Sequence, residues 1–172
     1  MIRNIAIAAI AMLASPASAD WQYTRWHMTT QELQATSPNI VPTTPSERRD
    51  QSNPYLGESL LKSGYNTEDL QYIAYYMFRE NKLVAVNLSS TRPQQQGPTA
   101  NMRLEKIYGP PYQDKSRRMA GGAMFCTITD RQWRSERDGN VISVNGMLCN
   151  EGGRDFFSVR YEPILSTGRT GL

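Results

Sequence analysis

The alternation of apolar and polar residues is clearest over residues 70–89, where two runs rich in Tyr, Ile, Phe and Val flank a short polar break. Such runs favour a β-hairpin with Glu80 and Asn81 as its loop, which places Arg79 opposite Lys82. A helix is the alternative, because some of the same apolar residues also recur at helical spacing. The density of β-branched and aromatic residues favours the strands.

This register sorts the hairpin side chains into two faces. One face is expected to be aliphatic and buried, with Ile73, Tyr75, Met77, Val84, Val86 and Leu88. The other face is aromatic and carries hydroxyl groups, with Tyr72, Tyr76 and Phe78 in one line. If a second layer covers this line, it is core. If no second layer covers it, this line is a surface that could bind a partner, because tyrosine-rich patches are common at protein interfaces.

Other elements are expected on both sides of the hairpin. One short helix is predicted over residues 30–36, with a threonine cap before it and a proline after it. A second helix is expected over 99–107, before a Gly-Pro-Pro stop. Segment 39–54, rich in proline and charge, indicates a long exposed loop, and 91–98 a low-complexity connector. Residues 55–65 fit either an irregular strand or a single helical turn.

The last third of the chain contains three strand-like runs, at residues 123–133, 141–149 and 156–164. A four-residue loop between the first two runs would place Cys126 opposite Cys149. On the other face the same register places Trp133 opposite Ile142. A bulge in the long first strand would change this pairing.

The order of elements predicts an α+β fold with two successive halves, at about 20–90 and 98–165. Each half holds a short helix followed by antiparallel strands, and together they are expected to form a twisted antiparallel sheet with helices on one face. Residues 20–165 would be a single domain. Residues 166–172 carry no structural signal and are expected to be a flexible tail.

The N-terminus has the composition of a secretory signal peptide. Arg3 precedes an apolar run at residues 5–13, and Ala17-Ser18-Ala19 is a small-residue cleavage site. We expect cleavage after Ala19 and a periplasmic or secreted protein. The residue directly after the cleavage site is not a cysteine, so no lipid anchor is expected there. No later apolar run is long enough to cross a membrane.

The chain contains two cysteines, Cys126 and Cys149. In an exported protein a disulfide is the default interpretation, ahead of a metal or redox site. A pair of structural free thiols is the alternative.

Several motifs resemble those of small exported bacterial proteins of unknown function. Trp26-His27-Met28-Thr29 resembles their Trp-Gly-Met-Thr opening, although His27 replaces the usual Gly. Phe78-Arg79-Glu80-Asn81-Lys82-Leu83 resembles their strand turn, and Tyr108-Gly109-Pro110-Pro111 their helix stop. In its helix–strand order the chain is similar to the architecture of β-lactamase-inhibitor proteins and small outer-membrane-assembly lipoproteins. The resemblance implies this fold and transfers no functional residue.

Residues for catalysis or metal binding are sparse. His27 is the only histidine, and no motif-bound Ser or Cys accompanies it to form a hydrolytic triad. One histidine and two cysteines expected in a bridge do not supply a zinc ligand set. The carboxylates are scattered, although glycosidase carboxylates can come from distant positions. We therefore predict no catalytic residue, no metal and no cofactor.

These observations predict a non-enzymatic exported protein of the bacterial envelope that binds a protein or another envelope component. Its contact residues would be Tyr72, Tyr76 and Phe78. The alternatives are a secreted hydrolase, such as a carboxylate-dependent glycosidase, and a purely structural envelope protein. A formal net charge of +3 gives no reason to expect nucleic-acid binding. The partner, the oligomeric state and the role of His27 stay open.

Overall fold

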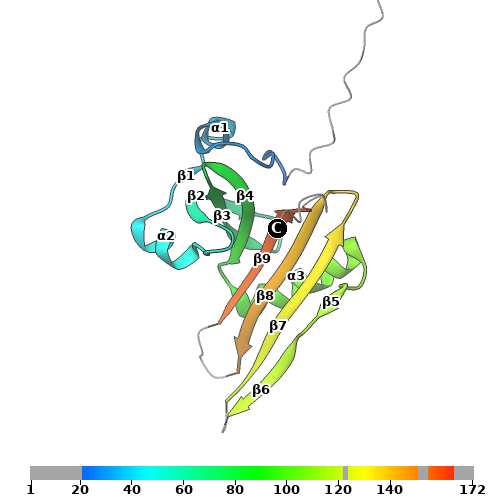
Figure 1. Cartoon of the computed structure of the whole chain (residues 1–172). Helices are drawn as coiled ribbons and strands as arrows, with labels where there is room; N and C mark the ends of the chain where they lie inside the picture. The colour runs from blue at the N-terminus through cyan, green and yellow to red at the C-terminus, as the bar shows by residue number, and fades with distance from the viewer. Residues whose placement is uncertain (1–20, 122–123, 151–154, 165–172) are drawn as a thin grey trace, which may run out of the picture.

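The computed structural model describes residues 21–121, 124–150 and 155–164. In this part of the chain, three helices accompany a nine-stranded antiparallel sheet (Figure 1). The expected combination of helices and antiparallel strands is confirmed. Of the described residues, however, 49% are in strands and 22% in helices, so this part of the chain is richer in strand than a balanced α+β fold. The expected signal peptide at 1–19 and the expected tail at 166–172 lie outside the described residues.

The sheet consists of two antiparallel meanders that join side by side. The strand order is β1-β2-β3-β4-β9-β8-β7-β5, and β6 also pairs with β7. The chain reaches the middle of the sheet twice, in β4 and in β9, and these two strands pair with each other. The strands are β1 (Val41–Pro42), β2 (Glu58–Asn66), β3 (Gln71–Arg79), β4 (Lys82–Ser90), β5 (Gln113–Asp114), β6 (Arg117–Gly121), β7 (Met124–Ser135), β8 (Asn140–Cys149) and β9 (Phe156–Pro163).

Helices α1 (Thr30–Thr36) and α2 (Pro45–Gln51) begin in the same way. Each has a threonine N-cap and a glutamate three residues later, so that side chain and backbone cap each other. Helix α1 confirms the prediction for 30–36. Helix α2 corrects the prediction of a long loop over 39–54, because Pro45 at the first helical position favours a helix instead of preventing one.

Helix α3 (Pro93–Tyr108) begins earlier than expected. The low-complexity segment 91–98, predicted to be a connector, supplies its first turns, with Pro93 at the position where a missing N–H costs nothing. The helix ends at Gly109, which has a positive φ of 77° and donates its N–H to the carbonyl of Glu105. The predicted Gly-Pro-Pro stop is therefore confirmed.

The central hairpin has the predicted loop. Arg79 pairs with Lys82, and Glu80 and Asn81 between them have φ values of 51° and 56°, the geometry of a two-residue type I′ turn. One step further the register shifts, between Met77 and Phe78. This bulge leaves Val84 unpaired, so every later pair differs from the expected one by a residue.

The bulge changes which side chains share a face. Tyr75 pairs with Asn87 and not with Val86, while Tyr76 pairs with Val86. The expected separation into an aliphatic core face and an aromatic outer face is therefore wrong. Side chains of both kinds form one hydrophobic core, which includes Tyr72, Ala74, Tyr76, Phe78, Leu83, Val86 and Leu88.

The predicted contact residues lie in this core. Tyr72 is 4% exposed, Tyr76 0% and Phe78 3%, so they are not a solvent-facing contact surface, and the alternative of a covering layer is correct. The hydroxyl of Tyr76 lies 2.7 Å from that of Tyr23 and 2.9 Å from that of Ser63. These bonds allow a polar group to be buried with little penalty.

Helix α3 packs closely on the sheet through Phe157, which is 1% exposed. A Cβ atom added at Gly97 of α3 or at Gly146 of β8 would lie 2.9 Å from the Phe157 ring in either case. The ring therefore fills a slot that requires both glycines. Helix α2 lies over the opposite face, where Glu47 pairs with Lys62 of β2. The prediction of helices on one face is therefore wrong.

The second meander follows the predicted register. Cys126 lies opposite Cys149 and Trp133 opposite Ile142. The two cysteines form a disulfide across β7 and β8, which confirms the predicted bridge.

Replacing both cysteines with serine should lower the free energy of unfolding by about 3 kcal/mol, because the bridge closes a long loop in the unfolded chain. The loop joins residues 23 positions apart. Urea unfolding of the wild type and of the double Cys126→Ser, Cys149→Ser variant measures this difference. Reductant should destabilise only the wild type, and a wild type insensitive to reductant would contradict the bridge.

Tyr76→Ala should cost about 3–5 kcal/mol of stability, as truncation of a buried aromatic ring does. The matched control is Tyr55→Ala, because Tyr55 is 84% exposed and its loss should change stability by no more than about 0.5 kcal/mol. Thermal and urea melts of the two variants make the comparison. Equal losses would mean that Tyr76 is not a core residue.

Candidate functional site: the open face of the sheet

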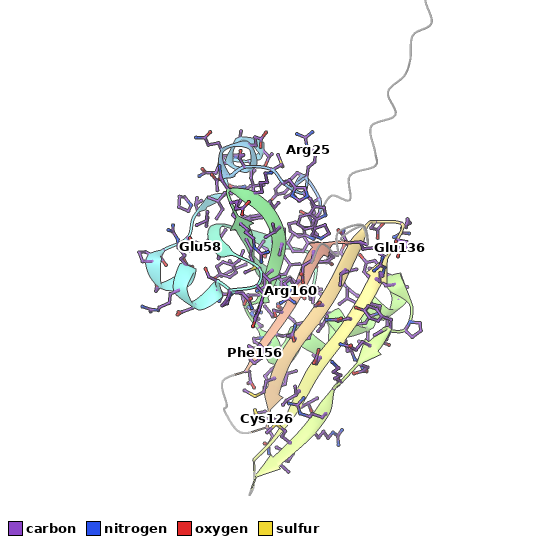
Figure 2. The ribbon with its side chains drawn as sticks, viewed as in Figure 1. Arg25, Glu58, Cys126, Glu136, Phe156 and Arg160 are labelled. Carbon is purple, nitrogen blue, oxygen red and sulfur yellow. A yellow bond between two sulfur atoms is a disulfide. The ribbon has the colours of Figure 1, made fainter. Side chains whose placement is uncertain are left out.

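The face of the sheet that points away from α3 is uncovered over β7, β8 and β9. It faces the viewer in Figures 1 and 2, with α3 behind the strands and α2 at one side. Because side chains alternate along each strand, the neighbours of the core residues point to this side. We call this surface the open face.

Two rows of polar side chains cross the centre of the open face. Each row takes one residue from each of four paired strands, in the order β7, β8, β9, β4. The first row is Gln132, Ser143, Arg160 and Asn87, and the second is Asp130, Asn145, Ser158 and Ser89. We call them the polar rows.

An apolar patch adjoins the polar rows toward the far end of the strands. Ile128, Met147 and Phe156 are direct cross-strand neighbours in β7, β8 and β9. Met119 of β6 lies one row further, beside the disulfide. Phe156 is 48% exposed and Met119 52%. We call these four residues the Met–Phe patch, and Figure 2 labels Phe156 and Cys126 at this end of the sheet, beyond Arg160.

A hollow of about 340 Å³ forms where the polar rows meet helix α2. The helix side contributes Asp50 and Gln51, and the apolar part of the lining comes from Leu56 and from Met77 of β3. Five members of the polar rows complete the sheet side, namely Asn87, Gln132, Asn145, Ser158 and Arg160. The hollow is thus lined mostly by groups that form hydrogen bonds.

Arg160 is the one positively charged side chain that lines the hollow, and Asp50 is the negatively charged one. Its Nε atom donates a hydrogen bond of 2.6 Å to Glu162, and both side chains are 26% exposed. The guanidinium group has five N–H donors, and this is its one hydrogen bond to a described residue. The side-chain amides of Asn87 and Asn145 make no hydrogen bond to any described residue. Together these groups form an unsatisfied hydrogen-bonding surface on a rigid sheet.

An ion pair links helix α2 to β2 at the border of the hollow. Glu47 accepts a hydrogen bond of 2.5 Å from Lys62 of β2 and also caps its own helix at Thr44. The hydrogen bond from Lys62, followed by those from Thr44, lowers the pKa of Glu47 from 4.5 to about 2. Beneath the helix, burial and then the nearby Glu47 charge raise the pKa of Tyr75.

Of the predicted site residues, only the two cysteines of the disulfide lie on the open face. Tyr72, Tyr76 and Phe78 point to the other side of the sheet, into the core. Cys126 and Cys149 lie on the open face. His27 is exposed, has a positive φ of 70°, and borders a small pocket with Arg79 and Glu162.

The polar residues of the open face were not predicted as a site, although strand β9 contains a signal for them. In residues 156–163, Phe157, Val159 and Tyr161 point inward, while Ser158 and Arg160 point outward. Alternation of this kind predicts one buried and one uncovered face. It does not indicate which other strands lie beside β9, and so it does not define a site.

Within the described ranges, no group of three or more His, Cys, Asp or Glu side chains is placed to hold a metal ion. Among the helices that the structure describes, none has the length and apolar character needed to cross a membrane. Comparisons with protein-family models, with curated proteins and with solved structures find no match to this chain.

The Glu47–Lys62 pair should make stability depend on acid pH. A carboxyl whose pKa is lower in the folded state stabilises the fold above its unfolded pKa, and that stabilisation is lost as the pH falls. For Glu47 the loss should occur between pH 4.5 and about 2. Urea unfolding across this range should show the difference between wild type and Glu47→Gln shrinking toward zero.

The matched control is Glu58→Gln, since Glu58 is an exposed glutamate beside α2. This variant should keep the acid dependence of the wild type. If Glu47→Gln and the wild type instead lose stability in parallel, the ion pair does not hold α2 in place.

Proposed function

We propose that this protein is a non-enzymatic, exported binding module of the bacterial envelope that holds a protein partner on the open face of its sheet. One observation carries the proposal. Hydrogen-bonding side chains without internal partners lie directly beside exposed Met and Phe side chains, on a surface formed by paired strands.

The chemistry of this surface favours a macromolecular partner. Met, Phe and Arg are enriched at protein interfaces, where an apolar centre is combined with a polar surround. The Met–Phe patch supplies the apolar part, and Arg160, Asn87 and Asn145 supply hydrogen-bonding groups next to it. Since the side chains stand on strands and not on a long loop, little order has to be gained on binding.

Several features support export and the two-part architecture. The N-terminal residues have the composition of a signal peptide, and the disulfide is typical of a protein that matures outside the cytoplasm. We infer that cleavage follows Ala19 and that the chain consists of two successive helix-and-meander halves. This order is also what motivates the resemblance to β-lactamase-inhibitor proteins and small outer-membrane-assembly lipoproteins.

Capture of a partner should require the open face. We expect Phe156→Ala combined with Arg160→Ala to weaken partner capture at least about tenfold, as loss of central interface residues does. Immobilised mature protein and chemical cross-linking in an envelope extract identify the partner and its contact site. Binding of the purified partner to each variant then gives the affinity change.

The control for this experiment is Met102→Ala. Met102 is 65% exposed on α3, on the other side of the sheet, so this variant should capture the partner as the wild type does. Unchanged capture by the open-face variant, or cross-links that map only to α3, would contradict the proposal. Melting curves show that each variant is folded.

A further inference from the structure

A second concavity lies on the opposite side of the sheet, beside α3. The helix packs against β4, β7, β8 and β9, and a cleft of about 210 Å³ lies between its second half and the ends of β2 and β3. Most of the wall is apolar and is formed by Leu70, Leu88, Ala100, Leu104 and Val159. An apolar cavity of about 150 Å³ holds a benzene ring in another protein, so this cleft has room for one substituted ring.

The polar part of the wall is formed by tyrosines, and Tyr72 is the unusual one. It is 4% exposed, yet its hydroxyl makes no hydrogen bond to any described residue. The hydroxyl is also not one of the fully enclosed polar atoms that lack a partner, and Tyr72 is one of the residues that line the cleft. By contrast, the hydroxyl of Tyr76, on the same face of β3, has two partners.

A hydroxyl in a mostly apolar wall that has no partner among the described residues is available for a hydrogen bond with a ligand. Burial raises the pKa of Tyr72 to about 12, so its hydroxyl stays protonated and can both donate and accept. The ring of Tyr65 stacks on that of Tyr72, with 6.2 Å between centroids. Tyr161 adds a third ring to the wall. These rings suit an aromatic ligand, because ring pairs attract in offset and edge arrangements.

Charged side chains lie at the mouth of the cleft, but they pair with each other. Arg103 lines it and forms an ion pair with Asp69, and it also donates to the hydroxyl of Thr67. The charge of Asp69 offsets that of Arg103, so the mouth offers little net attraction to a carboxylate or phosphate ligand. A neutral ligand needs no such attraction.

We propose that this cleft binds a free, neutral phenol with a single ring, whose hydroxyl pairs with that of Tyr72. The ring lies among Leu88, Leu104 and the tyrosines, and the rest of the wall supplies apolar contact. This site is independent of the open face, from which it is separated by the sheet.

The test uses p-cresol and toluene, which differ only in the hydroxyl group. Each is titrated into the exported full-length protein while backbone amide chemical shifts are recorded. We expect p-cresol to shift residues around the cleft with a dissociation constant of about 1 mM, as a small ligand of this size allows. Toluene should bind about fivefold more weakly, the value of one hydrogen bond.

Two variants locate the site. Tyr72→Phe keeps the ring but removes the hydroxyl, so p-cresol should bind it only as well as toluene does. Ala100→Leu fills the cleft and should abolish binding of both compounds. Met102→Leu, on the exposed side of the same helix, is the matched control and should bind both as the wild type does. Thermal melts establish that each variant is folded.

Three results would overturn the proposal. The first is no saturable shift around the cleft at about 20 mM p-cresol, well above the expected dissociation constant. The second is equal affinity of the wild type for p-cresol and toluene. The third is binding of N-acetyltyrosinamide as tightly as p-cresol, because this larger compound would indicate a tyrosine of a peptide and not a free phenol.

Discussion

A single unpaired residue in β4, Val84, determines which side chains face the interior. Beyond this bulge, Val86 and Leu88 turn to the side of Tyr72 and Tyr76. Helix α3 covers this face, which carries aromatic and aliphatic side chains together. Strand β9 pairs with β4 and continues the same face with its own apolar side chains. Without the extra residue, Asn87 would point inward and the polar rows would lose a member. The core and the open face are therefore two results of the same backbone irregularity.

Sequence patterns predicted the parts of the fold that depend on local chemistry. The loop at Glu80 and Asn81, the threonine cap of α1 and the pairing of Cys126 with Cys149 all follow from residues close to a turn or a cap. The bulge was not predicted, because one register slip near Met77 has no distinctive residue type. Helix α2 and the start of α3 were missed because proline was taken as a breaker at positions where it begins a helix. The open face depends on β4 lying beside β9, which are far apart in the chain, and no local pattern indicates that contact.

The sheet separates two surfaces of different chemistry. On one side, amide, hydroxyl and guanidinium groups stand in the polar rows and end at the Met–Phe patch. On the other side, tyrosine rings and aliphatic side chains enclose a small cleft next to α3. The first surface is broad and suits a macromolecule, whereas the second is narrow and suits a small molecule. Since adjacent residues of β9 point to opposite sides, the two surfaces share a backbone without sharing a side chain.

The position of β9 also has a consequence for how the chain folds. This strand is the last one in the part of the chain that the structure describes, yet it lies near the centre of the sheet, where it pairs with β4 on one side and β8 on the other. Until residues 156–163 have joined the sheet, β4 and β8 each have an unpaired edge, and the core lacks Phe157. Contacts of such large sequence separation slow folding. We therefore expect the core to close late in folding, when β9 inserts between the two meanders and brings Phe157 beneath α3.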